Sequence, residues 1–377
     1  MRQFQFLLFA LLCLPVLAAA QQLPTPPALA AKSWLLIESG SGQALAAQAP
    51  DERLEPASLT KLMTAYLTFA ALKQGTIKID QALPVSEKAW KTGGSRMFIQ
   101  VGTQVPVEDL IKGMIVQSGN DACVALSEAI AGSEDNFAQM MNREAQRLGM
   151  KASSFRNSTG MPDPQHYTTA RDLALLAGAL VRDFPEDYAK YYSIKEFRYN
   201  NITQPNRNRL LWLDPTVDGL KTGHTEAAGY CLISSAKRGP RRLLSVVLGT
   251  ASDSVRAQES LKLLNYGFQF YDAVQLYARN QVISSLKVWK GQERVVKAGF
   301  LNDFTMAVPK GYGPKIKAEF VSQQPLIAPV AQGQVVGTMK VSIDGKPYGD
   351  YPVLAIEAVP VAGLFGRLID TVRLWFN

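Results

Sequence analysis

Hydrophobic and polar positions alternate in an early part of the chain and then take up a helical spacing. Residues 33–37 form a β-prone run, a Gly-Ser-Gly turn follows at 40–42, and residues 43–47 can return as a second strand. A different period begins at Ser58, because apolar residues then recur three or four positions apart, at Leu59, Leu62, Met63, Tyr66 and Ala70. The pattern predicts a β-hairpin followed by a helix that starts at Ser58.

The middle of the chain is predicted to be helical before strands return. Apolar residues lie three or four apart in four segments, 109–114, 121–131, 136–148 and 169–181. Three β-rich runs follow, at 217–223, 230–236 and 243–249, and a closing helix is predicted at 259–270. A strand pair, a helical block, further strands and a helix are typical of an α/β domain with a mostly antiparallel sheet, and we expect it to span residues 32–273.

Beyond about residue 272 the pattern changes to short alternating runs. They lie at 318–321, 334–343 and 353–358, with Asp344 and Gly345 as hairpin-turn residues. We therefore predict a separate small all-β domain over residues 274–358.

The last stretch, residues 361–377, has the pattern of an amphipathic helix. Arg367, Asp370 and Arg373 fall on one face and apolar residues on the other, and the stretch is too short and too charged to span a bilayer. Such a helix is expected to lie on a membrane surface. The alternative is a helix packed on the β domain.

The first twenty residues are predicted to be a signal peptide. Arg2 gives a short basic start, residues 4–16 are apolar, and three alanines at 18–20 supply a cleavage site. Export would remove Cys13 and leave Cys123 and Cys231. These two could pair, but a chain of this size does not need a disulfide to fold, so we expect two buried free thiols.

Composition excludes several classes of function. The chain has 377 residues, is 47% hydrophobic and carries a net charge of +8, with its basic residues spread along the sequence. It is therefore a folded protein, and without a zinc-finger or basic-zipper pattern no nucleic-acid partner is expected; the charge suits anionic lipid or a substrate that ends in a carboxylate. Its two histidines, His166 and His224, stand far apart without an H-E-x-x-H pattern, so neither a metal site nor a cofactor is expected. For His166 we favour a structural role.

Three short motifs suggest chemistry: S-L-T-K at 58–61, S-G-N at 118–120 and K-T-G at 221–223. Each has little specificity alone, because S-x-x-K recurs at 234–237 and 284–287 and K-T-G at 91–93. Residues three apart share one face of a helix but point to opposite sides of a strand. Ser58 and Lys61 are therefore the better pair, since the other two S-x-x-K segments are β-prone, and Lys221, at the end of a β-prone run, is preferred to Lys91 in a loop-like stretch.

A serine needs a neighbouring base to become a nucleophile. Lys61 can serve if burial and a nearby positive charge, which we assign to Lys221, lower its pKa. Backbone N–H groups at the helix start would provide part of an oxyanion hole.

The ordered set of motifs resembles a known family. The segments PASLTK, QSGNDA, NRNRLLW and VDGLKTGHT, together with the signal peptide, the β domain and the amphipathic tail, are similar to the low-mass penicillin-binding D-alanyl-D-alanine carboxypeptidases, the penicillin-binding protein 5/6 group. The resemblance implies a β-lactamase/transpeptidase-like fold and a protein on the periplasmic face of the inner membrane. It also implies that the protein cleaves peptidoglycan stem peptides and binds β-lactam antibiotics.

The resemblance also implies roles for individual residues. Ser58 is acylated and Lys61 is the base, and Ser118 and Asn120 complete proton relay and substrate hydrogen bonding. The strand that carries K-T-G pairs with the peptide, and the remaining implied substrate-binding residues are Lys221, Thr222, Gly223, His224 (through its backbone N–H), Arg207 and Arg256.

Other interpretations stay open at this point. Ser118 and Asn120 are also the residues that would cap a helix near Asp121, and the alternative for Arg256 is an ordinary surface or capping residue. A class A-like β-lactamase uses the same motifs but needs a further glutamate, and no E-x-x-N occurs in the chain. A D,D-endopeptidase and a non-catalytic wall-binding scaffold are the remaining alternatives.

Overall fold

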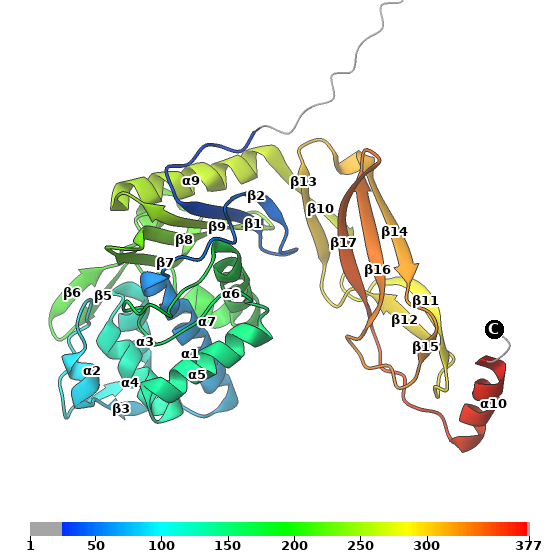
Figure 1. Ribbon diagram of the computed structural model, residues 1–377, viewed down its shortest axis with the longest axis horizontal. Helices are drawn as coiled ribbons and strands as arrows, with labels where there is room; N and C mark the ends of the chain where they lie inside the picture. Colours follow the sequence, from blue (N-terminus) through cyan, green and yellow to red (C-terminus); the bar gives the residue numbers. More distant parts are fainter. Residues whose placement is uncertain (1–24, 375–377) are drawn as a thin grey trace, which may run out of the picture.

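The computed structural model describes residues 25–374. The predicted signal peptide, residues 1–20, and the last three residues of the predicted amphipathic helix lie outside the described residues. Figure 1 shows an N-terminal part made of a sheet and helices, and an elongated β part beside it.

The N-terminal part is built on one antiparallel sheet in the order β2-β1-β9-β8-β7 (Figure 1). The first hairpin joins the later strands because every residue of β1 pairs with a residue of β9. The strands agree with the predicted runs to within two residues and are β1 (Ser33–Glu38), β2 (Ala44–Gln48), β7 (Val217–Thr225), β8 (Gly229–Arg238) and β9 (Arg241–Thr250).

Alternation along the strands divides the apolar side chains between two cores. Leu35 and Ile37 of β1 join the larger core with the helical block, whereas Trp34 and Leu36 pack beneath α9 on the opposite face. The sheet is therefore the middle layer between one long helix and a group of helices. Those helices are α1 (Lys61–Gln74), α3 (Val107–Val116), α4 (Asn120–Ala131), α5 (Glu134–Arg147), α6 (Ala170–Asp183) and α7 (Pro185–Tyr191).

The helix α9 (Asp253–Phe270) begins six residues earlier than the sequence predicts. Ser252 is its N-cap, and its side chain accepts a hydrogen bond from the backbone N–H of Val255. The first turn carries Asp253 and Arg256 in place of apolar residues, so the hydrophobic period becomes visible only further along.

Several short elements were not predicted, because too few residues contribute to a period. Pro185 at the first position of α7 is a helix-start signal that does not depend on hydrophobic periodicity. Lys91, expected in a loop, is the last residue of a short helix. In the N-terminal part, the unpredicted elements besides α7 are α2 (Glu87–Lys91), α8 (Leu210–Leu213), β3 (Ala82–Pro84), β4 (Gln104–Pro106), β5 (Glu196–Tyr199) and β6 (Ile202–Pro205).

The β part follows α9 without a linker, since β10 starts at Tyr271. Its six-stranded sheet has the order β14-β16-β17-β12-β11-β15, and β10 pairs separately with β13. Asp344 and Gly345 form the predicted tight turn, with φ of 53° and 75°. The strands are β10 (Tyr271–Tyr277), β11 (Val282–Trp289), β12 (Val295–Gly299), β13 (Phe304–Pro309), β14 (Ile316–Ser322), β15 (Leu326–Ile327), β16 (Val335–Ile343) and β17 (Lys346–Ala355), and the last of these ends three residues before the predicted run at 353–358 does.

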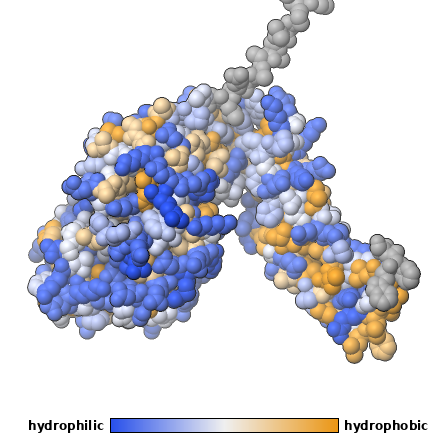
Figure 2. Space-filling model, in the orientation of Figure 1, coloured by the Kyte–Doolittle hydropathy of each residue, from blue (hydrophilic) through white to orange (hydrophobic). Residues whose placement is uncertain are grey.

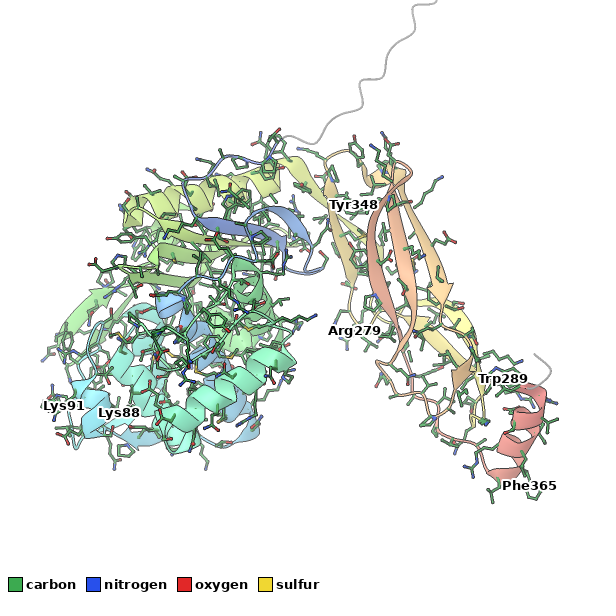
Figure 3. All side chains as sticks on the ribbon, viewed as in Figure 1. Lys88, Lys91, Arg279, Trp289, Tyr348 and Phe365 are labelled. Atoms are coloured by element: carbon green, nitrogen blue, oxygen red, sulfur yellow. The ribbon has the colours of Figure 1, made fainter. Side chains whose placement is uncertain are left out.

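The two parts touch at the first hairpin. Gln43 donates a side-chain hydrogen bond to the Tyr348 hydroxyl at 2.6 Å, and the Tyr271 hydroxyl donates to the Leu45 carbonyl at 2.9 Å. Figure 3 shows Tyr348 at the end of the β part nearest to this contact.

A C-terminal helix, α10 (Leu364–Leu374), lies at the opposite end of the β part (Figure 1). Asp370 accepts a hydrogen bond from the Lys290 backbone N–H at 2.8 Å, which ties the helix to the turn after β11. Its apolar side chains face outward, and Phe365 is 85% exposed (Figures 2 and 3). Among the described residues no helix is long and apolar enough to cross a membrane.

Candidate active site

Ser58 and Lys61 meet at the junction of two helical segments. Ser58 lies in a 3-10 turn, Ala57–Thr60, and α1 begins at Lys61, so the predicted single helix is a tight turn followed by an α-helix. The Lys61 Nζ atom lies 2.9 Å from Ser58 Oγ. Ala57 takes a left-handed φ of 48°, unusual for a residue with a side chain, and thereby turns the chain into the site.

Burial favours the neutral form of the Lys61 amine, which is the form that can act as a base. Its side chain is 1% exposed, and this burial lowers the pKa to about 8, with the Arg207 guanidinium acting in the same direction. Cys123 and Asp121 act in the opposite direction. Burial is thus the principal cause of the lowered pKa, as the sequence predicts, but the additional positive charge comes from Arg207 and not from Lys221.

The S-G-N motif lies between α3 and α4. Ser118 has a φ of 61° and is 2% exposed, and its hydroxyl has no hydrogen-bond partner among residues 25–374. Asn120 is the first residue of α4 and donates its side-chain amide to the Gly93 carbonyl at 2.7 Å. The capping interpretation does not hold, because the N-cap is Gly119 and neither side chain caps the helix.

The K-T-G motif lies on β7, the strand at one edge of the sheet. Lys221 is buried, and burial together with the positive charges of Lys61 and Arg207 holds its pKa well below the usual range. Gly223 passes close to the turn that carries Ser58, since a Cβ atom there would lie 3.1 Å from the Pro56 carbonyl oxygen. The absence of a side chain thus lets β7 approach the serine.

His224 and Arg256 flank the end of β7. His224 is exposed and its ring lies 4.0 Å from that of Tyr230, centroid to centroid. Arg256 is 5% exposed, pairs with Asp253 and donates to the Gly223 carbonyl at 3.2 Å. Arg256 is therefore no ordinary surface residue, because it holds the strand that carries K-T-G.

A cleft of about 530 Å³ brings most of the predicted residues together. Lys61, Asn120 and Lys221 are buried and do not line it. The predicted residues that line it are Ser58, Ser118, Arg207, Thr222, Gly223, His224 and Arg256.

Some residues of the site were not predicted from sequence. Arg209, Tyr230 and Asp253 also line the cleft, and Asp253 stands one helical turn before Arg256, a spacing that signals an ion pair. Asp121 accepts the backbone N–H groups of 97–99 at 2.8 to 3.2 Å and so fixes the loop that approaches the cleft at Ser95. A lone aspartate gives no sequence signal for such a role.

The thiols are free and buried, as predicted. Cys123 donates to the Gly119 carbonyl at 3.1 Å, and burial raises its pKa to about 12. His166 is also buried, beside Phe155, with Nε2 3.0 Å from Thr60 Oγ1, in keeping with a structural role. Within residues 25–374 no group of three or more histidine, cysteine, aspartate or glutamate side chains is arranged to hold a metal ion.

The fold and the site together define a serine acyl-enzyme hydrolase, in which a buried amine beside a serine hydroxyl faces the edge of an antiparallel sheet. The chain belongs to the D-alanyl-D-alanine carboxypeptidase family, whose profile matches residues 20–252, and residues 271–361 match the C-terminal domain of penicillin-binding protein 5. A serine mechanism and the binding of β-lactams follow from this membership. The family resemblance is confirmed, and so is the predicted fold of a sheet-plus-helix domain followed by an all-β domain.

Individual relatives match nearly the whole chain. It is 42% identical to the D-alanyl-D-alanine carboxypeptidase DacC of Escherichia coli, covering 98% of this chain and 94% of that one. The structure of penicillin-binding protein 5 from Haemophilus influenzae matches with a TM-score of 0.81 at 41% identity, over 89% of this chain and 99% of that one. Penicillin-binding protein D2 from Listeria monocytogenes, solved in an ampicillin bound form, matches with a TM-score of 0.59 at 31% identity, over 64% of this chain and 98% of that one.

Proposed function

We propose that this protein removes the terminal D-alanine from peptidoglycan stem peptides through an acyl-enzyme on Ser58, with Lys61 as the base. The observation that carries the proposal is the 2.9 Å contact between Lys61 Nζ and Ser58 Oγ, at a buried position where the lysine pKa is lowered to about 8. A neutral amine at that distance can accept the serine proton.

Acylation then proceeds in two steps. Ser58 Oγ attacks the carbonyl carbon of the D-Ala-D-Ala bond as its proton passes to Lys61 Nζ. The backbone N–H groups of Ser58 and His224 stabilise the oxyanion of the tetrahedral intermediate. The C–N bond then breaks, and the proton held by Lys61 passes through Ser118 to the leaving amine; the Ser118 hydroxyl is otherwise unpartnered among the described residues. Water later attacks the ester and releases the shortened peptide.

The edge of β7 provides the place for the substrate backbone, since an edge strand offers free N–H and C=O groups. The terminal carboxylate of the substrate is attracted by Lys221, Arg207 and Arg256 and accepts a hydrogen bond from Thr222. Asn120 orients the peptide or the loop at Gly93. This local density of positive charge would favour an anionic chain end over a neutral one.

Intact-mass measurement after brief exposure to benzylpenicillin tests the proposal. We expect one penicilloyl adduct per molecule, mapped to the peptide that contains Ser58, and no adduct on Ser58→Ala. A wild-type protein that gains no adduct, or an adduct mapped elsewhere, refutes the assignment.

Turnover separates the remaining enzyme classes. Slow clearance of the adduct, with D-alanine released from a pentapeptide, supports a carboxypeptidase. Rapid hydrolysis of nitrocefin would indicate a β-lactamase, and cleavage of cross-linked dimers without release of D-alanine would indicate an endopeptidase. Restoration of cell shape by Ser58→Ala would indicate a scaffold.

We further propose that the protein is exported and held at the periplasmic face of the inner membrane. The leader at residues 1–20 supports export, and the exposed apolar face of α10 supports a peripheral anchor. Residues 32–273 would form the peptidase domain, residues 274–358 the β domain and residues 361–377 the anchor.

A further inference from the structure

Two consecutive carbonyl groups are bound by α1 directly behind the cleft. Lys61 Nζ donates to the Thr159 carbonyl at 2.6 Å, and the Thr64 hydroxyl donates to the Ser158 carbonyl at 2.6 Å. Both donors lie on one face of the helix, three residues apart. The segment 157–161 therefore supplies one of the two hydrogen-bond partners of the Lys61 amine among the described residues, and Ser58 Oγ is the other.

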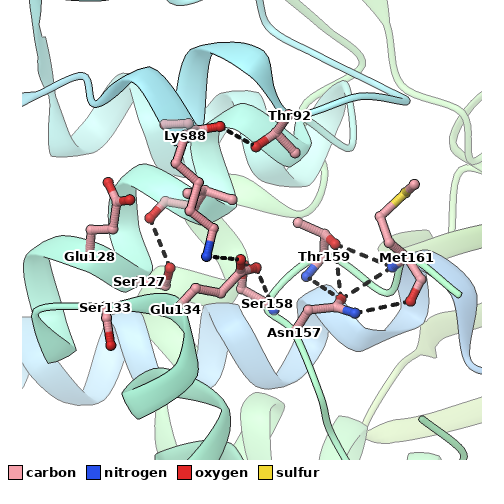
Figure 4. A network of polar contacts seen from close by, with 12 residues as sticks. Lys88, Thr92, Ser127, Glu128, Ser133, Glu134, Asn157, Ser158, Thr159 and Met161 are labelled. Carbon is pink, nitrogen blue, oxygen red and sulfur yellow. Dashed lines mark hydrogen bonds and ion pairs between the residues drawn. The ribbon is translucent and has the colours of Figure 1, made fainter. Parts of the chain in front are cut away.

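A carboxylate holds the opposite side of this segment. Glu134 Oε1 accepts from the Ser158 backbone N–H at 3.1 Å and from its hydroxyl at 2.7 Å, while Oε2 pairs with Lys88 at 2.9 Å (Figure 4). Burial acts to raise the pKa of Glu134, but the donors from Ser158 and Lys88 outweigh it and keep the pKa below its usual range. Glu134 is also the first residue of α5, where the helix dipole favours negative charge.

The segment cannot shift freely in other directions. Asn157 Oδ1 accepts from the backbone N–H groups of 159, 160 and 161 at 2.7 to 3.2 Å, which makes the turn a compact unit. Gly160 has a φ of 84°, and a Cβ atom there would lie 1.8 Å from the Ala57 carbonyl oxygen. A displacement of Ser158 would therefore be transmitted to the Thr159 carbonyl, one peptide unit away.

We propose that Glu134 is a positioning residue for catalysis, acting through Ser158 and the Thr159 carbonyl to aim the lone pair of Lys61 at Ser58. This inference rests on the proposed function, in which Lys61 is the base. A neutral amine has two N–H groups and one lone pair, so an acceptor fixed at 2.6 Å takes one N–H and leaves the lone pair to face the serine hydroxyl. Without that acceptor the Lys61 amine would still be present, but its lone pair would no longer be directed at the Ser58 hydroxyl.

The charge of Lys88 contributes less than the two bonds to Ser158. Its side chain is 54% exposed, so solvent screens the ion pair with Glu134. Glu134→Gln keeps an oxygen for both Ser158 donors and loses the ion pair, whereas Glu134→Ala loses all three contacts. Lys88→Met removes the ion pair alone and is the matched control.

The experiment measures the limiting rate constant of acylation by benzylpenicillin under saturating conditions, normalised to the number of sites that bind penicillin, well below each variant's Tm. We expect Glu134→Ala to acylate about tenfold or more slowly at an unchanged half-saturating concentration, because misalignment of reacting groups by about 1 Å costs up to ~100-fold. Glu134→Gln and Lys88→Met should remain within about threefold of wild type.

Each outcome has a distinct meaning. Wild-type rates per active site in Glu134→Ala, even with a lowered Tm, would overturn the proposal, since a purely structural role reduces only the number of folded sites. Equal slowing in Glu134→Ala and Lys88→Met would also overturn it. If Glu134→Ala does not fold, Ser158→Ala, which removes the 2.7 Å bond alone, should slow acylation about fivefold or more, and a rate within the threefold range of the control variants would refute the idea. Failure of wild type to acylate would instead refute the proposed function.

Discussion

The side chain of Lys61 is a cation placed where water cannot reach it. Removing an ammonium group from solvent favours its neutral form, and the nearby Arg207 adds to this effect, so the pKa of about 8 follows from position and not from an unusual residue. In the proposed mechanism, its contacts with Ser58 and the Thr159 carbonyl determine which hydroxyl the amine can deprotonate.

The pH dependence of acylation follows from this pKa. The base is active when neutral, so the limiting rate of acylation by benzylpenicillin should rise with pH and level off above about 8. Arg207→Gln removes a charge that lowers the Lys61 pKa, so its profile should move to higher pH. Arg209→Gln is the control, because Arg209 also carries a guanidinium at the cleft but pairs it with Asp253. A flat profile, or a shift of Arg207→Gln to lower pH, would contradict this account.

His166 should make stability depend on pH. Burial lowers its pKa to about 4 from the ordinary 6.5, so between these values the unfolded chain binds more protons than the folded one. The free energy of unfolding should therefore decrease by up to about 3 kcal/mol as the pH falls through this window. Urea denaturation of wild type and His166→Gln at several pH values tests this. An equal pH dependence of the two proteins would exclude His166 as the cause.

At the residue scale the sequence predicts side chains better than backbone atoms. Ser58, Ser118 and Lys221 are recognisable because their types and order are unusual together. The Thr159 carbonyl has no counterpart in composition, since every residue carries one. The left-handed φ of Ser118 arises from the packing of α3 against α4, contacts that no local pattern reports.

At the scale of elements, long periodic segments are predictable and short ones are not. The strands of the main sheet and the helices α3 to α6 agree with the predicted runs because each buries a full stripe or face. The hairpin β5–β6, which brings Pro205 to the cleft, has only four residues per strand and mostly exposed side chains. Its position depends on tertiary contacts such as the one from Gln204 to the Arg96 carbonyl.

The turn between β16 and β17 gives a test at this scale. Both turn residues have positive φ, which β-branched residues adopt only with strain, so Gly345→Val should lower the free energy of unfolding by about 1–2 kcal/mol. Asp344→Asn should be nearly neutral, because asparagine tolerates the left-handed region. Calorimetry measures both, and the acylation rate should not change. Equal stability of Gly345→Val and wild type would be inconsistent with the turn described.

At the scale of the whole molecule, β7, which lines the cleft, lies in the N-terminal part, whereas α10 lies at the far end of the β part (Figure 1). The contacts of Tyr348 with Gln43 and of Tyr271 with Leu45 join the two parts, and α10 is tied to the far end of the β part through Asp370. Sequence could indicate the two parts by their different periods. It could not indicate their contact, because Gln43 and Tyr348 are 305 positions apart.

Removal of the C-terminal helix tests the proposed anchor. Truncation after Ala362 leaves the hydrogen bond of Ala362 to Lys290 intact and removes the exposed apolar face. The shortened protein should no longer sediment with vesicles that contain anionic lipid, while its penicillin acylation stays unchanged. Phe365→Asp should weaken sedimentation. Thr371→Ala should not, because Thr371 is not one of the exposed apolar residues of α10. Full sedimentation of the truncated protein would rule out the anchor.

The acceptor that aims Lys61 belongs to the main chain, and this affects how the protein tolerates mutation. Any amino acid installed at position 159 still presents a carbonyl, so a scan of side chains at that site would report how well each substitution packs and the loss of the two hydrogen bonds of the Thr159 hydroxyl, to Asn157 Oδ1 and from the Met161 N–H. Mutations that change the orientation of the Lys61 amine should instead occur at the residues that support the segment 157–161. A survey of resistance or loss-of-function alleles would then identify neighbours such as Glu134. It would not identify the carbonyl oxygen of Thr159, although that oxygen is the acceptor.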